Sequence, residues 1–423
     1  MISSKVIDSR IEEIKEFALK NENRVSLFTV QDIIKNKNEK VDEELMNYVV
    51  DLLRKNGIMI LPQDADEEYD TDENEPENFI PAEVNITQVP MTVSNIMERL
   101  ENEEYDLSPD FQRNGNLWTE EKQSRLIESL MLKIPLPAFY FDASREDQWV
   151  VIDGLQRLSA FRNYLVDGKN GQKHAFKGLQ YLKDFNNKTF DELPRQYSRR
   201  IKEASIVAYT VQKGTPETIV FNIFQRINTG GEPLNSQEIR QALYSGKGTE
   251  FIKVLAECPE FKKATQYALK TDRMLDREYA LRFLSFTTLD YKKLYKGNID
   301  NFLIKGIKKA DSFDEVDRER VTEQFIRVMN ACHQIFGKYA FRKYNEQFHR
   351  GPINKAIFEL WSVCLAELKD EQLECLEKKK QTLLLKFGDL LRTEEFAAVL
   401  KSGDRSSFLK RIDMGRTFVK EFL

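Results

Sequence analysis

The feature that most constrains the fold is an acidic segment that interrupts the chain after its first sixty residues. Residues 64 to 77 contain nine Asp or Glu and no Lys or Arg. A segment with so much charge and so little apolar surface does not bury enough to order itself within a core. We therefore expect this segment to be weakly ordered or disordered, and the 423 residues suffice for two to three domains.

Charge is distributed unevenly around this segment. The net charge is −5 overall; the first 63 residues carry −1 and the acidic segment −9, which leaves +5 for residues 78 to 423. A mildly basic body beside an acidic arm is typical of a protein with a polyanionic partner, or of an arm that mimics one. A solubilising linker has the same composition and is the simpler interpretation of the arm.

Composition also argues against several classes of protein. No apolar run is long enough to cross a bilayer, and the first residues do not have the pattern of a signal peptide. The four cysteines show no CxxC spacing, which is typical of reduced thiols, so we expect a cytoplasmic protein without a membrane partner. Three scattered histidines do not favour an HNH-type nuclease, and the metal ligands stay unknown.

The pattern predicts an α+β chain in four parts. Residues 1–62 read as a small helical module, with a candidate second-helix cap at Thr29, and residues 63–82 as an acidic linker. Residues 83–235 alternate between strand and helix patterns, which predicts an α/β core. Residues 236–423 show repeated helical periods and are predicted to form an all-helical subdomain. The strands expected in the core are 139–141 and 149–152, as a hairpin, and 205–211.

The richest candidate site is the turn after the second of these strands, Asp153-Gly154-Leu155-Gln156-Arg157. Gly154 allows the backbone to approach a ligand, while the following helix N-terminus and the Arg157 fork suit phosphate. Asp153 suits a ribose hydroxyl or a metal. A plain strand–turn–helix with Asp153 as its cap has the same pattern, and spacing alone favours it.

Two further Gln-Arg pairs adjoin turns. One is in Phe111-Gln112-Arg113; the other, Gln225-Arg226, leads into Asn228-Thr229-Gly230-Gly231, a loop able to form a backbone nest for an anion. The two glycines serve equally well as a helix C-cap. The segment Ser245–Thr249 looks superficially like a Walker A loop. It is rejected because Gln241 stands five residues before Gly246, where that motif requires its first glycine.

Together these blocks resemble the DGQQR-motif family, which includes the N-terminal half of GmrSD-type modification-dependent restriction enzymes. The resemblance runs from about residue 85 to 420 and rests on Ser108–Arg113, Trp149–Leu158 and Arg226–Leu243. It implies a ParB/sulfiredoxin-like core that binds and hydrolyses a nucleoside triphosphate, with Mg²⁺ as the expected ion, in defence against phage DNA. No HNH pattern follows, so the resemblance implies that a nuclease partner performs any cleavage.

The resemblance also assigns roles to single residues. The expected catalytic residues are Asp153, Gln156 and Arg157. Those assigned to nucleotide binding are Phe111, Gln112, Arg113, Arg125, Glu128, Ser129, Gly154, Asn228, Gly230 and Gly231. Leu155 stands where the family has Gln, which removes one polar contact and puts turnover in doubt.

Basic side chains are candidates for DNA contact, which is salt-sensitive and blind to sequence when it is made to phosphates. These residues are Arg195, Arg199, Arg200, Lys202, Arg342, Lys343 and Arg350. A solvated helix face is the alternative interpretation for each cluster.

The first 75 residues loosely resemble region 1.1 of housekeeping bacterial sigma factors, through Leu27–Ile33, Val49–Leu53 and Gly57-Ile58. A generic three-helix winged module fits equally well. The leading interpretation of the chain is a nucleotide-driven DNA sensor of a prokaryotic, restriction-like defence system. The alternative is a non-catalytic regulator that binds DNA or RNA polymerase through this first module. The sequence also leaves open that the chain binds a second copy of itself.

Overall fold

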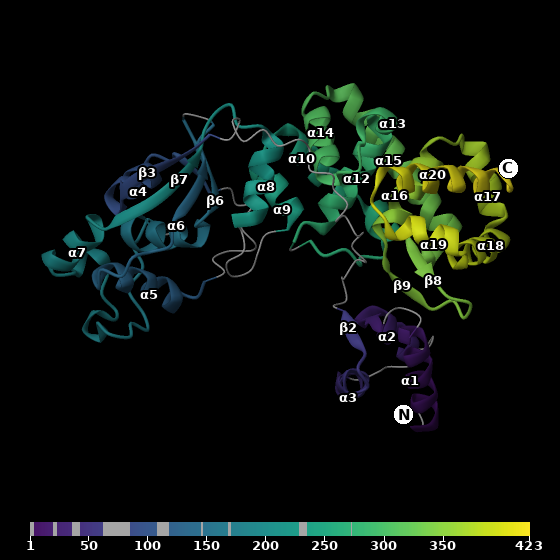
Figure 1. Ribbon diagram of the computed structural model, residues 1–423, viewed down its shortest axis with the longest axis horizontal. Coiled ribbons are helices and arrows are strands. Elements are labelled where there is room, and N and C mark those ends of the chain that lie inside the picture. The colour runs from purple at the N-terminus through teal and green to yellow at the C-terminus, as the bar shows by residue number, and fades with distance from the viewer. Residues whose placement is uncertain are drawn as a thin grey trace. The chain divides into compact units, whose positions relative to one another are not determined.

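The structure is a computed structural model that describes residues 4–19, 23–35, 43–61, 85–107, 118–144, 147–167, 171–227, 235–271 and 273–423. It divides into two compact units. The sheet unit is Pro76–Ser245, and the helical unit is Met1–Glu75 together with Gly246–Leu423 (Figure 1). The combination of a small sheet with many helices confirms the α+β fold class.

A five-stranded sheet in the order β3-β7-β5-β6-β4 forms the centre of the sheet unit. Its strands are β3 (Ile86–Thr92), β4 (Tyr105–Asp106), β5 (Phe139–Asp142), β6 (Trp149–Asp153) and β7 (Ser205–Val211). β5 and β6 form the predicted antiparallel hairpin, and β7 pairs antiparallel with β3 and parallel with β5. β4 extends the sheet by a short parallel pairing with β6.

Helices cover one face of this sheet. They are α4 (Val93–Glu101), α5 (Glu120–Met131), α6 (Leu155–Phe161) with a π-helical extension at Arg162–Val166, and α7 (Arg195–Lys202). Phe139, Phe141 and Val151 alternate with residues of the opposite face and are buried against Ile127 and Leu158. This period-two pattern puts one core between the sheet and these helices. α8 (Glu217–Ile227) and α9 (Ser236–Leu243) pack against β6, so the sheet unit extends beyond the predicted end of the core at residue 235.

The first part of the helical unit has its own small core. It consists of α1 (Ser4–Leu19), β1 (Arg24–Ser26), α2 (Leu27–Lys35), α3 (Glu43–Lys55) and β2 (Met59–Leu61). β1, which the sequence did not reveal, pairs in parallel with β2. The prediction that Thr29 caps the second helix was wrong. α2 already begins at Leu27, so Thr29 lies inside the helix, where it is buried. The likeness of this module to sigma region 1.1 stays a prediction.

The remainder of the helical unit is an array of helices. They are α10 (Lys247–Glu257), α11 (Pro259–Ala264), α12 (Leu275–Thr288), α13 (Tyr291–Leu294), α14 (Ile299–Asp311), α15 (Glu315–Phe336), α16 (Lys355–Ala366), α17 (Asp370–Lys378), α18 (Lys380–Arg392), α19 (Glu394–Lys401) and α20 (Arg405–Lys420). One hairpin, β8 (Arg342–Tyr344) with β9 (Arg350–Ile353), interrupts this otherwise helical region.

A buried ion network joins three of these helices. On α12, Arg282 donates to Glu278 over 2.7 and 3.0 Å, and it also donates to Glu359 of α16. Arg411 of α20 donates to the second carboxylate oxygen of Glu359 over 2.8 Å. All four side chains are buried, so charge compensation within the network is what makes their burial tolerable.

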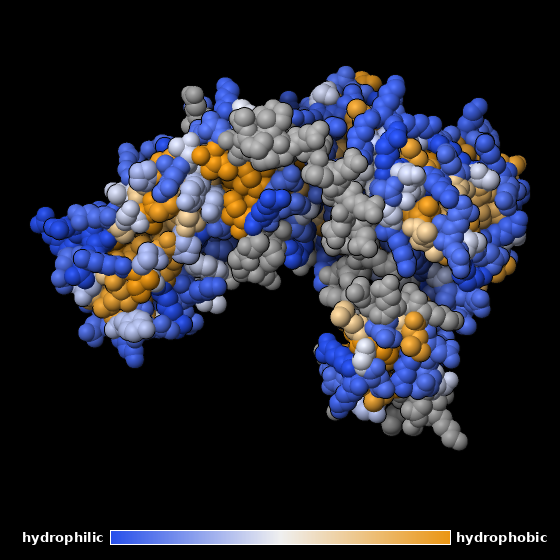
Figure 2. All heavy atoms as spheres, in the orientation of Figure 1, coloured by the Kyte–Doolittle hydropathy of each residue, from blue (hydrophilic) through white to orange (hydrophobic). Residues whose placement is uncertain are grey.

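Hydrophilic residues cover most of the described surface seen in Figure 2, as the high content of charged residues leads one to expect. Within the described part of the chain, no helix combines the length and apolarity needed to span a membrane.

Candidate functional site

The end of β6 forms a tight corner at Gly154. This residue has φ +108°, which side chains rarely tolerate, and it starts α6 without a side-chain cap. A Cβ at Gly154 would come within 2.8 Å of the Cε1 atom of Phe139 on the neighbouring strand. Glycine is therefore required for two independent reasons, backbone conformation and close packing. The turn is a strand–turn–helix, but the expectation that Asp153 caps the helix was wrong, because the N-cap position is Gly154 and no side chain caps it.

Arg157, in the first turn of α6, stabilises the corner through buried contacts. Its guanidinium donates to Asp153 Oδ2 over 2.7 Å, to the carbonyl of Ala138 over 3.0 Å and to the carbonyl of Pro137. It also stacks over Phe139, with 4.2 Å from the guanidinium carbon to the ring centre. Burial lowers the pKa of Arg157, and Asp153 partly offsets the shift. Arg157 therefore acts mainly as a structural link, or strut, between the residues just before β5 (Pro137 and Ala138) and the end of β6 (Asp153). The sequence did not indicate this role.

Two polar groups at this corner remain open to a ligand among the described residues. The side chain of Asp153 is 38% exposed, and only its Oδ2 atom accepts from Arg157. The Oε1 atom of Gln156 is buried and has no hydrogen-bond partner within the described part of the chain. A buried acceptor without a donor is costly, so Gln156 marks a place where a donor from a ligand would be stabilising.

The three candidate residues on α5 serve a neighbouring loop. The buried carboxylate of Glu128 accepts from the backbone N–H groups of Gln180, Tyr181 and Leu182, over 2.8 to 3.0 Å. Arg125 donates to the carbonyl of Gly178. Ser129 donates to the backbone of its own helix. These contacts hold the loop against α5, and none of them joins Asp153 or Arg157, so the structure gives Arg125 and Glu128 a structural role.

Several predicted residues fall outside the described part of the chain. They are Phe111, Gln112, Arg113, Asn228, Gly230 and Gly231. Their assignment to nucleotide binding therefore stays a prediction.

α7 carries the first predicted DNA-contacting cluster. Arg195, Arg199 and Lys202 follow one another at helical spacing and are exposed, while Ile201 anchors the helix in the core. Arg200 is exposed as well and lies over the ring of Tyr197. Cationic side chains beside aromatic rings on one helix suit a phosphate backbone.

The second predicted cluster is divided by burial. Arg342 is only 1% exposed, and its guanidinium donates to the carbonyl of Gly351 over 2.9 Å. A buried guanidinium does not reach a DNA phosphate, so the structure contradicts its place in an interface. Lys343 and Arg350 are half-buried, and Arg350 donates to Gln266.

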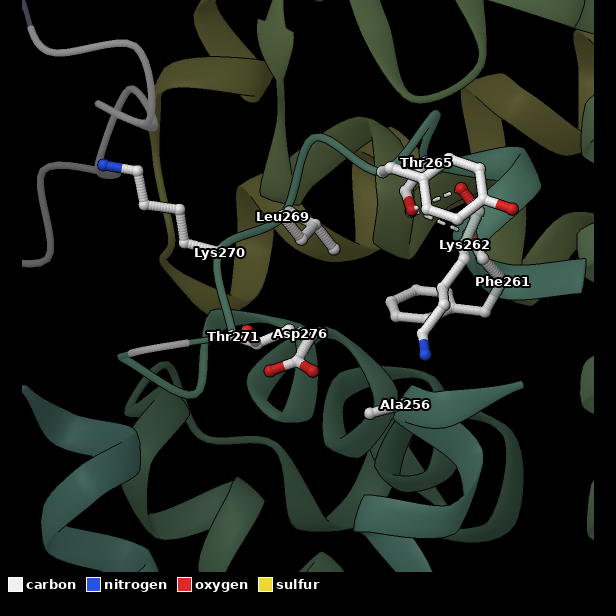
Figure 3. A pocket seen from close by; sticks show the side chains of 9 residues that line it. Ala256, Phe261, Lys262, Thr265, Leu269, Lys270, Thr271 and Asp276 are labelled. Atoms are coloured by element: carbon white, nitrogen blue, oxygen red, sulfur yellow. Dashed lines mark hydrogen bonds between the residues drawn. The ribbon is translucent and has the colours of Figure 1, made fainter. Parts of the chain in front are cut away.

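A separate cavity of about 540 Å³ lies in the helical unit, between the end of α11 and the start of α12. Lys262 and Asp276 point into it, whereas Lys270 extends away (Figure 3). Burial raises the pKa of Asp276, although the backbone N–H and the charge of Arg277 oppose this shift. No motif in the sequence pointed to this cavity.

Metal binding by protein side chains alone has no support in the part of the chain that the structure describes. No three or more His, Cys, Asp or Glu side chains gather there into a group able to hold an ion.

The sheet and its glycine corner define an α/β domain with a compact polar site at the end of a strand. Residues 93–245, just over a third of the chain, match the family model described as the N-terminal domain of the GmrSD restriction endonuclease. This confirms the resemblance to GmrSD-type proteins over that region. No curated protein matches the chain, and no solved structure does. The DGQQR motif assignment and the ParB/sulfiredoxin-like topology therefore stay predictions.

Proposed function

We propose that the chain is a nucleotide-binding DNA sensor of a restriction-like defence system. The observation that carries the proposal is the buried, unpartnered acceptor of Gln156 beside the half-exposed carboxylate of Asp153. Both residues lie inside the region similar to a restriction endonuclease domain. The sugar hydroxyls and the base of a nucleoside triphosphate supply hydrogen-bond donors for these two acceptors.

The three residues of the corner have different tasks in this proposal. Asp153 accepts from a ribose hydroxyl or orients an ion through its Oδ1 atom, and Gln156 contacts a donor of the nucleotide directly. Arg157 is a positioning residue, because its guanidinium already binds Asp153 and two main-chain carbonyls.

Mg²⁺ fits this corner only together with a nucleotide. The ion is commonly held by one or two carboxylates, with substrate phosphates and water completing its shell. Asp153 supplies one carboxylate, and no second acid accompanies it in a metal-binding group of the described chain. When bound, Mg²⁺ would neutralise charge on the phosphates.

The nucleotide experiment measures phosphate release from each of the four ribonucleoside triphosphates with Mg²⁺, with and without DNA. We expect DNA-modulated turnover of at least one nucleotide in the wild type and its loss in Gln156→Leu. The matched control is Gln180→Leu, which replaces an exposed glutamine of the same unit. Equal turnover in wild type and Gln156→Leu would contradict the proposed role of Gln156. Absence of both turnover and nucleotide binding in the wild type would contradict the function.

The DNA experiment measures binding as a function of salt. We propose that α7 contacts phosphates, so replacing Arg195, Arg199 and Lys202 by Gln should weaken binding and reduce the salt slope by about 0.9 per lost contact. A control of equal charge replaces three exposed lysines of the helical unit, Lys263, Lys401 and Lys420. The proposed interface is rejected if the two triple variants show the same slope.

A further inference from the structure

The cavity in the helical unit brings a cation and an anion to one space. Its lining residues come from α10, α11, α12 and the loop between α11 and α12. Its volume of about 540 Å³ falls within the range of small-molecule sites, about 300–1,000 Å³. The ammonium of Lys262 and the carboxylate of Asp276 both point into it (Figure 3). A ligand in this cavity would therefore meet both charges.

The wall of the cavity is held in place by contacts within the helical unit. The backbone N–H of Tyr267 donates to the carbonyl of Lys262 over 2.8 Å, and the side chain of Gln266 accepts from Arg350. Gln266 and Tyr267 keep positive φ angles of +56° and +55°, a conformation that these contacts sustain. Phe261 is 1% exposed, and its ring packs against rings of α15 and α16. The cavity is therefore formed before a ligand enters, which lowers the cost of binding.

The carboxylate of Asp276 has no paired cation. Asp276 is 9% exposed, and its Oδ1 atom accepts from the backbone N–H of Arg277 over 2.9 Å. Among the described residues, no other hydrogen bond and no ion pair reaches this carboxylate. Burial raises the pKa of Asp276, and the charge of Lys262 is the smallest of the effects that oppose this shift. A buried carboxylate without a paired cation is costly, so a cation on a ligand would stabilise it.

The ammonium of Lys262 is open as well. Its side chain is partly buried, and within the described part of the chain it makes no hydrogen bond or ion pair. A ligand with only negative charge would be repelled by Asp276, and one with only positive charge by Lys262. An uncharged ligand would leave both groups without a counter-charge. A ligand that carries an amine and an acid group pairs both of them.

We propose that this cavity binds a free amino acid with a large apolar side chain, its amine on Asp276 and its carboxylate on Lys262. Ala256, Phe261 and Leu269 supply apolar surface for the side chain of the ligand. The site is separate from the nucleotide corner of the sheet unit and does not rest on it. The phosphates of a nucleotide would meet the carboxylate of Asp276, so a nucleotide fits this cavity less well.

Isothermal titration calorimetry on the full chain at neutral pH tests the proposal, with leucine, methionine, phenylalanine and tryptophan as probes. At least one of them should bind at one site per chain, with a Kd of about 1 mM or tighter. Asp276→Asn and Lys262→Met should each weaken this binding about 10- to 150-fold, because each removes a hydrogen bond between charged groups. The controls Glu257→Gln and Lys263→Met change exposed charges on α10 and α11 outside the cavity and should bind as the wild type does.

Two derivatives of the tightest-binding amino acid show whether each charge is paired as proposed. The N-acetyl derivative lacks the cation, so it should bind wild type and Asp276→Asn equally weakly. The amide lacks the anion, so it should bind wild type and Lys262→Met equally weakly.

Three results would overturn the proposal. The first is that none of the four amino acids binds the wild type. The second is that Asp276→Asn and Lys262→Met bind the amino acid as tightly as the wild type does. The third is that Asp276→Asn loses as much affinity for the N-acetyl derivative as for the amino acid, because the effect is then structural. Lys262→Met, at a partly buried position, carries the test alone should Asp276→Asn prove unstable by thermal melting.

Discussion

Arginine–carboxylate pairs occur in both units of this protein, but they differ in how many carboxylate oxygens are paired and in how deeply the side chains are buried. In the helical unit, Glu359 receives Arg282 on one oxygen and Arg411 on the other, and all three side chains are buried. In the sheet unit, Arg157 occupies only one oxygen of a partly exposed Asp153, and the adjacent Gln156 keeps a buried acceptor without a partner. A buried carboxylate with both oxygens paired to arginines indicates structural stabilisation, whereas a partly exposed carboxylate beside a buried acceptor without a donor indicates a place for a ligand.

The largest effect is expected from a substitution within the buried ion network. Glu359→Gln removes the charge that compensates Arg282 and Arg411, and removing one partner of a buried ion pair typically costs about 3–5 kcal/mol. We expect a drop of this size in the free energy of unfolding, measured by guanidinium titration of the helical signal, with unchanged nucleotide binding. A loss below about 1 kcal/mol, the usual worth of an exposed pair, would show that the network is not structural.

The next effect concerns the glycine corner. Gly154→Ala combines a positive φ with a clash against Phe139, so we expect a loss of about 2–4 kcal/mol in unfolding free energy. The matched control is Gly214→Ala, where φ is +98° but nothing lies within 4 Å of the added Cβ. The control should cost about 1–2 kcal/mol. Equal losses in the two variants would mean that Phe139 does not restrict this turn.

A smaller effect is expected when the strut at the corner is changed. Arg157→Lys keeps the charge and loses the planar fork that reaches Pro137, Ala138 and Asp153 together. We expect a loss of about 1–3 kcal/mol in unfolding free energy, with weakened nucleotide binding. A variant of wild-type stability that fails to bind nucleotide would instead show that Arg157 contacts phosphate, as the sequence pattern suggested.

The smallest effect concerns a single helix cap in the helical unit. Asp404 accepts from the backbone N–H of Ser407 at the start of α20. Burial tends to raise the pKa of Asp404, but hydrogen bonds from Ser402 and Ser407 outweigh it and lower the pKa to about 2. Asp404→Ala should cost about 1 kcal/mol at neutral pH.

The pH dependence of this cap follows from its lowered pKa. A carboxylate with a lowered folded pKa stabilises fully above its unfolded value of 3.8, and loses this contribution as the pH falls towards 2. The melting temperatures of wild type and Asp404→Ala should therefore differ at neutral pH and converge in that acid window. A difference that stays constant down to pH 2 would exclude the ionised carboxylate as its source.

The sequence predicts the parts of the fold and the site that depend on neighbouring residues, and it misses those that depend on contacts between distant segments. Short apolar runs predicted β5, β6 and β7, and the Asp153-Gly154 pair located the corner, because these signals are local. α7 escaped notice since only Ile201 in it is fully buried, and β4 is two residues long. The main-chain partners of Arg157 and Glu128 are about 20 and 50 residues away in the sequence, and no residue type indicates them. The stacking of Tyr140 on Tyr209 depends on β5 and β7 being neighbours in the sheet, which periodicity does not encode.

Hydrogen–deuterium exchange with and without saturating nucleoside triphosphate and Mg²⁺ tests the central claim most directly, because it compares both units in one experiment. We expect slower exchange at β5, β6 and the start of α6. We expect no change around the buried network of α12, α16 and α20. Unchanged exchange at the corner, or protection confined to the cavity lined by Lys262 and Asp276, would contradict the assignment of the nucleotide to the sheet unit.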